Sequence, residues 1–135
     1  VIAILSTLNG KWTGLNNLIT EVIKQIPDSK VRDRLLVVEH MDKLEDMGIL
    51  GNSGYVVDSV PLAIAAANKV GQLGIENMFQ SLINIGGDTD TNCSMAGQIA
   101  GCLVGYKHIP NHLKNKLVRV DGYKKLQGIL NRLEY

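Results

Sequence analysis

The residues best able to do chemistry lie between two apolar runs in the middle of the chain. Residues 86–91 read Gly-Gly-Asp-Thr-Asp-Thr, so two carboxylates and two hydroxyls occupy four consecutive positions. Asp90 follows Asp88 by two residues and Thr91 follows it by three, so their oxygens can converge on one small volume. Ligands that are all oxygen suit Mg²⁺, Mn²⁺ or Ca²⁺ better than zinc. The pattern predicts a cation site at the start of a helix.

Three other interpretations of the same residues can be considered. Helix capping remains open, whereas an EF-hand and a P-loop are excluded by the residues that follow. Asp88 can act only as an N-cap, since its carboxylate suits the free N–H groups and the dipole of the following helix. An EF-hand is excluded, because Cys93 and Ile99 stand where its loop needs glycine and glutamate. A phosphate-binding P-loop is excluded because no Gly-Lys-Ser or Gly-Lys-Thr follows the glycines.

Composition indicates one all-helical domain over residues 1–135. Hydrophobic residues make up 45% of the chain and aromatic residues only 4%, which favours a helical core of Leu, Ile, Val and Ala. A formal net charge of +1 gives no reason to expect nucleic acid or an anionic membrane as the main partner. No apolar run reaches the roughly 18 residues of a membrane span, and residues 1–8 look like a helix and not a signal peptide.

The two cysteines indicate a reducing compartment. Cys93 and Cys102 are nine residues apart on one expected helix, hence on opposite faces and roughly 13 Å apart along its axis. A disulfide between them would break that helix. We therefore predict free thiols and a cytoplasmic protein.

Apolar spacing predicts two amphipathic helices before the first glycine-rich loop. The first ends at Pro27, and its expected inward face consists of Leu15, Leu18, Ile19, Val22, Ile23 and Ile26. The second covers residues 31–47 and stops at Gly48, with Val31, Leu35, Val38 and Leu44 inward. Its acidic residues are interleaved with basic ones, which favours a solvated face over a metal cluster.

Small and apolar residues predict the helices around the acidic cluster. Residues 48–55 form a glycine-rich loop, and residues 60–70 form a helix with Pro61 in its first turn. The next apolar stripe, which delivers the chain to Gly86, consists of Ile75, Met78, Phe79, Leu82 and Ile83. In the helix after Thr91, glycines recur on one face, where close approach of a neighbouring helix would offset their low helix propensity. These glycines are Gly97, Gly101 and Gly105.

Beyond Tyr106 the sequence predicts one final helix that packs on the core and exposes a cationic side. Its apolar residues are Leu117, Leu126, Ile129, Leu130 and Leu133. His108 and His112 have helical i, i+4 spacing, but Pro110 between them argues against a zinc pair.

These motifs together resemble a known family. Residues 86–91, then Ala96-Gly97, Ala100-Gly101 and Gly105, then Ile109-Pro110, are similar to the C-terminal signature of the ADP-ribosylglycohydrolases, which include the dinitrogenase reductase-activating glycohydrolases. Residues 50–63 resemble the loop and helix that precede this signature in the family. The resemblance is dense from residue 49 to residue 112, roughly half the chain.

The resemblance implies an orthogonal multi-helix bundle and a hydrolase that cleaves ADP-ribose from modified protein side chains with two Mg²⁺ or Mn²⁺ ions. It makes Asp88, Asp90 and Thr91 metal ligands, with Asp90 as the catalytic residue that bridges both ions. It also places a substrate-binding loop beside the nucleotide, with the Tyr55 ring available to stack on adenine. The loop residues are Gly51, Asn52, Ser53, Gly54 and Tyr55.

The chain departs from the family in one respect. Members are about twice as long, and their N-terminal half supplies further metal ligands from adjacent acidic and hydroxyl residues; no such triplet occurs here outside the signature. The resemblance thus implies half a site, completed by a missing N-terminal half or a partner chain. The alternatives are a catalytically inactive relative that binds metal or ADP-ribose, and a helical domain with a structural role.

Overall fold

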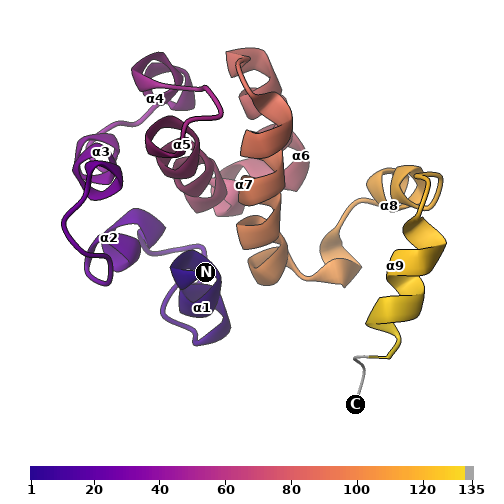
Figure 1. Ribbon diagram of the computed structural model, residues 1–135. Coiled ribbons are helices and arrows are strands. Elements are labelled where there is room, and N and C mark those ends of the chain that lie inside the picture. Colours follow the sequence, from indigo (N-terminus) through magenta and orange to yellow (C-terminus); the bar gives the residue numbers. More distant parts are fainter. Residues whose placement is uncertain (133–135) are drawn as a thin grey trace. The chain divides into compact units, whose positions relative to one another are not determined.

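A computed structural model describes residues 1–132. The chain divides into two compact units, Val1–Gly105 and Tyr106–Tyr135, which are described separately. All the regular secondary structure of the described residues is helical, which confirms the predicted all-α class (Figure 1). The expectation of a single domain stays a prediction.

The first unit holds the helices that position the acidic cluster. Its helices are α1 (Ile2–Leu8), α2 (Leu18–Ile23), α3 (Lys30–Val38), α4 (Leu44–Leu50), α5 (Val56–Asn68), α6 (Val70–Ile85) and α7 (Thr89–Val104). The second unit contains a short 3₁₀ turn, η1 (Tyr106–His108), and the helices α8 (Asn111–Leu117) and α9 (Tyr123–Leu130).

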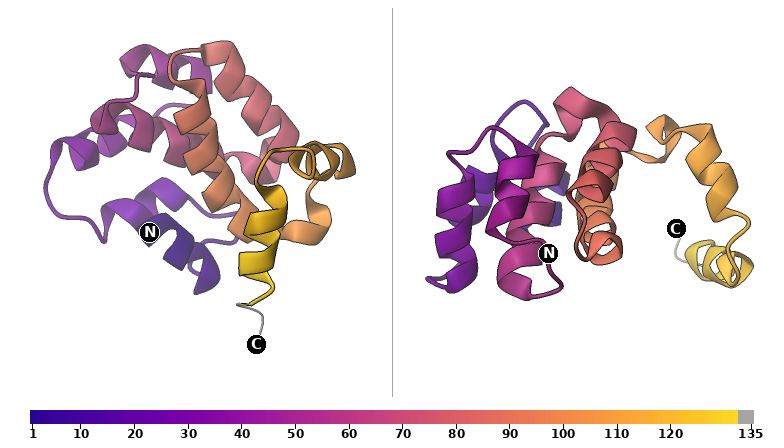
Figure 2. Two further views of the ribbon diagram at one scale, coloured as in Figure 1. Left: turned by 45° about the vertical axis from the view of Figure 1, so that its right-hand side comes forward. Right: turned by 90° about the horizontal axis from the view of Figure 1, so that it is seen from above.

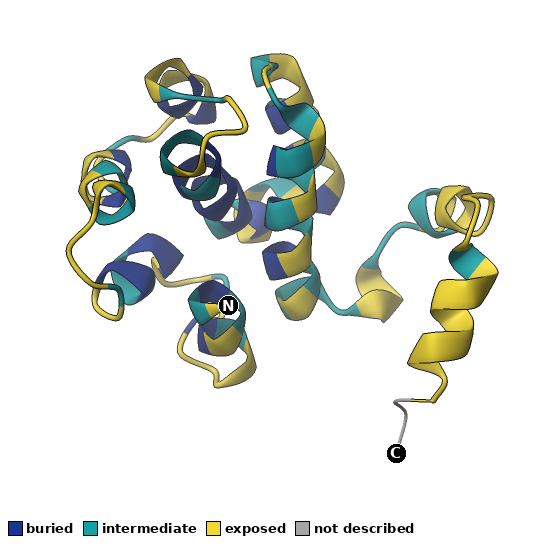
Figure 3. Cartoon of the chain, in the orientation of Figure 1, coloured by how far each residue is buried: buried dark blue, intermediate teal, exposed yellow. Residues whose placement is uncertain are grey.

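Helix α5 is the centre of the first unit. It packs against α2, α3, α4, α6 and α7, with α3 on one side and α7 on the other (Figures 1 and 2). Residues 61–67 are buried without interruption (Figure 3), as expected for a helix that is apolar on all sides. Four of these seven residues are alanines, which let neighbouring helices approach closely.

Helices α6 and α7 form the hairpin that carries the acidic cluster at its turn. Met78 and Leu82 of α6 and Ala96 and Ala100 of α7 are buried in the contact region. The α6 backbone kinks at Gly74, whose φ of 76° and ψ of 161° are non-helical and favour glycine. Because buried residues of both helices flank the turn between them, the packing of α6 against α7 fixes its position.

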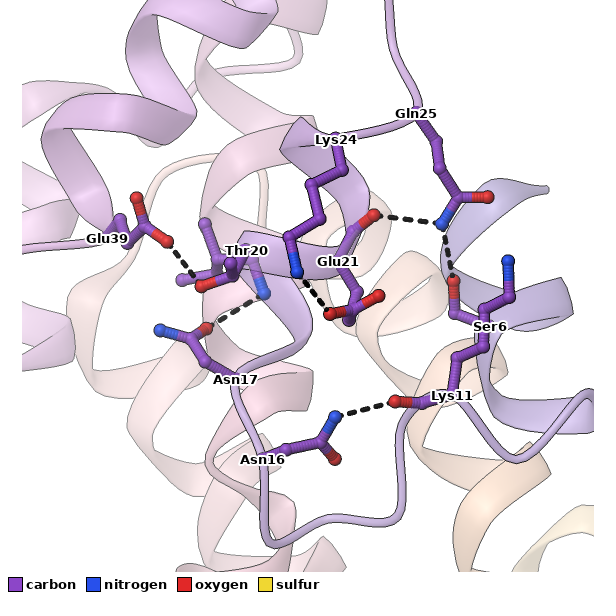
Figure 4. A network of polar contacts seen from close by, with 10 residues as sticks. Ser6, Lys11, Asn16, Asn17, Thr20, Glu21, Lys24, Gln25 and Glu39 are labelled. Carbon is purple, nitrogen blue, oxygen red and sulfur yellow. Dashed lines mark hydrogen bonds and ion pairs between the residues drawn. The ribbon is translucent and has the colours of Figure 1, made fainter.

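Polar contacts tie the first three helices together (Figure 4). Asn17 caps α2 by accepting from the Ile19 N–H at 2.9 Å. Gln25 donates to the Ser6 hydroxyl of α1 at 3.3 Å, and the Thr20 hydroxyl donates to the Glu39 carboxylate after α3. These bonds link α1, α2 and the end of α3 on the outer side of the core.

The first expected helix was too long at both ends, because α2 covers only Leu18–Ile23 and leaves Leu15 and Ile26 outside it. Leu15, expected to point inward, precedes α2 and is 97% exposed, whereas Trp12 is buried in its place and donates from Nε1 to the Asn16 carbonyl at 3.1 Å. The Asn17 cap fixes the helix start after Leu15. Apolar spacing alone could not show this, because Leu15 fits the helical period.

The expected helix over residues 31–47 was also wrong, since α3 ends at Val38 and α4 begins at Leu44. Gly48 was expected to stop it but lies buried inside α4, where an added Cβ would overlap the Ile85 side chain. Gly48 thus permits close contact between α4 and the end of α6. The glycine-rich loop begins at Gly51, three residues later than predicted.

Two further boundaries differ around α5 and in α7. Helix α5 begins at Val56, so Pro61 stands in its interior and not in its first turn. In α7, Gly97 packs against Phe79, whose ring would lie 3.0 Å from an added Cβ, but no atom lies within 4 Å of one at Gly101. Gly105 ends the helix with φ of 72°. The predicted close approach therefore holds for Gly97 and is wrong for Gly101 and Gly105.

The second unit differs from the single core-packing helix that was predicted. Two helices form, and none of residues 106–132 is buried (Figure 3). Leu117, Leu126, Ile129 and Leu130 are each about half exposed, and Leu133 lies outside the described residues. Lys114 lies 4.9 Å from the centre of the Tyr106 ring, a cation–π contact within this unit.

Candidate functional site

The turn between α6 and α7 presents the acidic cluster. Gly86 and Gly87 have φ of 78° and 74°, a left-handed conformation that glycine adopts without strain. The chain then enters α7, whose N-cap is Asp88; its Oδ1 accepts from the Thr91 N–H at 3.4 Å. The capping interpretation of Asp88 is therefore confirmed as one of its roles, and it leaves Oδ2 for another contact.

The three predicted metal ligands lie on one turn of helix. Asp90 is exposed, whereas Asp88 and Thr91 are half-buried. No group of three or more His, Cys, Asp or Glu side chains suited to a metal ion occurs among residues 1–132. The described cluster thus offers two carboxylates and one hydroxyl, an all-oxygen set that fits Mg²⁺ or Mn²⁺ but needs further ligands.

The cluster keeps Asp90 in its charged form. A side-chain hydrogen bond with Asp88 lowers the pKa of Asp90, and the backbone N–H groups of Thr91 and of Asp90 itself lower it further. Burial of Cys93 raises the pKa of that thiol, and the nearby Asp90 charge adds to the effect. At neutral pH the site therefore presents a carboxylate and a neutral thiol.

The predicted substrate loop lies directly against this turn. The backbone carbonyl of Asn52 accepts from the Asp88 N–H at 2.9 Å and from the Asn92 side-chain amide at 3.1 Å. The Asn52 side-chain amide donates to the Ile85 carbonyl at 3.3 Å. The two predicted parts of the site, the loop and the acidic cluster, are thus brought together by hydrogen bonds.

Glycines make this close contact possible. A Cβ at Gly54 would overlap Oδ2 of Asp88, and a Cβ at Gly87 would overlap the Asn52 carbonyl oxygen and lie 2.7 Å from its Oδ1. Each loop therefore contributes one glycine that leaves room for the other loop's polar atoms. Gly54 lies beside the second oxygen of a predicted metal ligand.

A carboxylate of α5 anchors the other side of the substrate loop. Asp58 accepts from the Ser53 hydroxyl at 2.7 Å, and Arg34 of α3 lies 3.9 Å from it. Arg34 also donates to the carbonyl of Leu50, the last residue of α4. An added Cβ at Gly51 would overlap the Asp58 carboxylate, so this glycine also serves close contact.

The loop offers backbone donors more than side-chain donors. The Ser53 hydroxyl is engaged, since it donates to Asp58 and accepts from the Tyr55 N–H at 3.1 Å. Within residues 1–132, no acceptor is bonded to the N–H groups of Asn52, Ser53 and Gly54. Tyr55 is 57% exposed, as stacking on a ligand would require. The roles predicted for Gly51, Asn52, Ser53, Gly54 and Tyr55 stay predictions.

No role was predicted for Asn92, Asp58 or Arg34, which hold the two loops in place. Asp58 lies in the segment of residues 50–63 that resembles the family, but the resemblance implies no role for it. A signal existed for Asn92, because it lies four and seven residues before Ala96 and Ile99, on the apolar side of α7. The contacts of Arg34 span 16 and 24 residues of sequence and leave no local pattern.

The remaining candidate residues are two cysteines and two histidines. Cys93 and Cys102 are free thiols, as predicted. His108 and His112 belong to the second unit, at η1 and at the start of α8. Among residues 1–132, no helix has the length and apolar character to span a membrane.

The fold and the site together describe an all-α protein with two carboxylates at the turn between α6 and α7. Comparison with known sequences gives its family. The ADP-ribosylglycohydrolase model matches residues 1–134, so the chain belongs to the ADP-ribosylglycohydrolase family. This confirms the resemblance found in the sequence.

A curated relative and a search of solved structures complete the comparison. The chain is 32% identical over 91 residues to the ADP-ribosylarginine hydrolase Tri1 of Serratia proteamaculans (strain 568). The alignment covers 65% of this chain and 23% of that relative, so the chain corresponds to about a quarter of its length. No solved structure matches the chain.

Proposed function

We propose that the intact protein is a Mg²⁺- or Mn²⁺-dependent hydrolase that releases ADP-ribose from modified protein side chains. The observation that carries the proposal is the hydrogen-bonded contact between the acidic turn and the loop of residues 51–55, which sets cation ligands beside free backbone donors. Family membership supports the reaction class, and the named relative supports arginine as the modified side chain.

The residues of this chain have separable tasks in the proposal. Asp88, Asp90 and Thr91 would hold the metal, which orients ribose hydroxyls and activates water when bound. The Asn52, Ser53 and Gly54 N–H groups would donate to anionic oxygens of the ADP-ribose, and the exposed Tyr55 ring would stack on adenine. The remaining ligands would come from an N-terminal half of the polypeptide or from a partner chain.

The first prediction tests turnover in the intact protein. We expect release of ADP-ribose from an ADP-ribosylated arginine substrate that EDTA abolishes. Asp90→Asn should lower kcat/KM more than about 100-fold, the upper end of what residues that merely orient metal ligands cost. Product release can be followed by chromatography, with a serine-linked substrate run in parallel.

Asp42→Asn is the matched control, because Asp42 is exposed between α3 and α4 and the change removes the same charge. Turnover that persists in EDTA or in Asp90→Asn contradicts the metal mechanism. A wild-type protein that binds ADP-ribose without turnover would instead favour the inactive binding relative.

A further inference from the structure

Asn92 is a buried polar residue with only half of its side chain in use. It lies in the first turns of α7 and is 1% exposed. Its Nδ2 donates to the Asn52 carbonyl at 3.1 Å, whereas its buried Oδ1 has no hydrogen-bond partner among the described residues. A buried acceptor without a partner destabilises a fold, so Asn92 is a costly choice for packing alone.

The contact with Asn52 dictates which way the amide points. The carbonyl of Asn52 can only accept, so the NH₂ group of Asn92 must face it. The opposite orientation would set two oxygens 3.1 Å apart and leave the NH₂ group where Oδ1 now lies. The unpartnered Oδ1 is therefore a direct consequence of the bond that Nδ2 makes.

That bond joins the two halves of the candidate site. The Asn52 carbonyl receives only two donors from the described residues, the Asp88 N–H and the Asn92 amide, and both belong to the start of α7. The N–H groups of Asn52, Ser53 and Gly54, which flank this carbonyl, have no acceptor within the described chain. The position of these donors relative to the acidic turn therefore depends on how firmly Asn52 is held.

We propose that Asn92 is a positioning residue that holds the loop of residues 51–55 against the acidic turn and thereby sets affinity for ADP-ribose. This rests on the proposed function, since it concerns the same site. Metal affinity should depend on Asn92 much less, because Asp88, Asp90 and Thr91 are held by the helix turn itself. The inference thus separates two properties that a general loss of structure would change together.

The test variant is Asn92→Leu in the intact protein. Leucine has nearly the same size, removes the donor and also removes the unpartnered acceptor, so the melting temperature should stay within about 4 °C of wild type. We expect ADP-ribose, measured by calorimetry with Mg²⁺ present, to bind about three- to tenfold more weakly. The Mn²⁺ dissociation constant should change by less than about twofold.

A control and a ligand-free readout make the test specific. Asn77→Leu is the matched control, because the exposed Asn77 also donates to a backbone carbonyl, that of Leu73 at 2.9 Å, but does so within α6. We expect hydrogen exchange of the Asp88 N–H, which is bonded to the Asn52 carbonyl, to quicken in Asn92→Leu and not in Asn77→Leu. Asn92→Ala removes the same donor and the same acceptor without adding a charge, so it should also weaken ADP-ribose binding and quicken Asp88 exchange, and it serves if the leucine variant fails to fold.

Three results would overturn the inference. ADP-ribose affinity equal to wild type in Asn92→Leu would show that the bond has no effect on the loop. Equal loss of Mn²⁺ and ADP-ribose affinity would indicate a general structural role. Unchanged exchange of the Asp88 N–H would exclude the positioning role. That readout holds even if the wild-type protein bound no ADP-ribose, a result that would by itself refute the proposed function.

Discussion

At the scale of single residues, the candidate site depends on two glycines, which have no side chain, as much as on the carboxylates. Gly54 and Gly87 lie where any Cβ would overlap a polar atom of the opposite loop. Gly87 also needs its positive φ, but Gly54 does not, so the only demand on Gly54 is for space beside Asp88. A substitution at Gly54 can therefore test the contact without straining the backbone.

Gly54→Ala should weaken metal binding in the intact protein. The added methyl group must displace Oδ2 of Asp88, a predicted ligand, and we expect the Mn²⁺ dissociation constant to rise about tenfold or more. Calorimetric titration measures it directly. Gly101→Ala is the control, since no atom lies within 4 Å of its added Cβ. Wild-type affinity in Gly54→Ala would mean that Asp88 is not a ligand or that its carboxylate can move freely.

The carboxylates could be found from the sequence, but the residues that hold them could not. Asp88 and Asp90 are two positions apart, so one local pattern contains both. The donors that reach Asn52 come from 36 and 40 residues further along the chain, and only the packing of α5 between its neighbours brings them together. Long-range contacts of this kind follow from tertiary structure and leave no periodic signal.

At the scale of elements, the spacing of apolar residues predicted that helices form but not where they begin and end. Residues 31–47 keep a helical pattern across a real break, because Val38 and Leu44 are both buried although they belong to different helices. The pattern at Leu15 fits the helix period, but the Asn17 cap decides where α2 begins. Capping and tertiary contacts therefore override periodicity at helix boundaries.

The glycines of α7 should respond differently to substitution. Gly97→Leu should lower the free energy of unfolding by about 1–3 kcal/mol, because the Phe79 ring already lies 3.0 Å from where a Cβ would stand. Gly101→Ala should raise it by up to about 1 kcal/mol, the difference in helix propensity. Chemical denaturation of the intact protein gives both values. A destabilised Gly101→Ala would show that another segment covers this face.

At the scale of the whole molecule, the described chain supplies part of a site and a scaffold for it. The family model covers residues 1–134, yet the aligned region is only 23% of the hydrolase Tri1. Within residues 1–132 no group of three or more His, Cys, Asp or Glu side chains could hold a metal ion. A bound metal ion should therefore join this part of the protein to the segment that supplies the remaining ligands. The effect can be measured as a gain in the free energy of unfolding when metal is added.

Mg²⁺ should stabilise the intact protein. The gain should rise with the Mg²⁺ concentration and should require Asp90. Once the Mg²⁺ concentration exceeds the dissociation constant, each tenfold increase should add about 1.4 kcal/mol to the free energy of unfolding. The gain should be absent in Asp90→Asn and retained in Asp42→Asn. Melting curves at several Mg²⁺ concentrations give the gain as a rise in melting temperature.

The pH dependence of this gain has a defined sign. Because the hydrogen bond with Asp88 lowers the pKa of Asp90, the carboxylate stays ionised in the folded protein below the pH at which it would protonate when unfolded. Protons should therefore compete with Mg²⁺ for Asp90 only at strongly acidic pH, and the gain should be similar at pH 7 and pH 5. A gain that disappears between those two values would mean that a histidine, or a carboxyl group with a raised pKa, controls metal binding in place of Asp90.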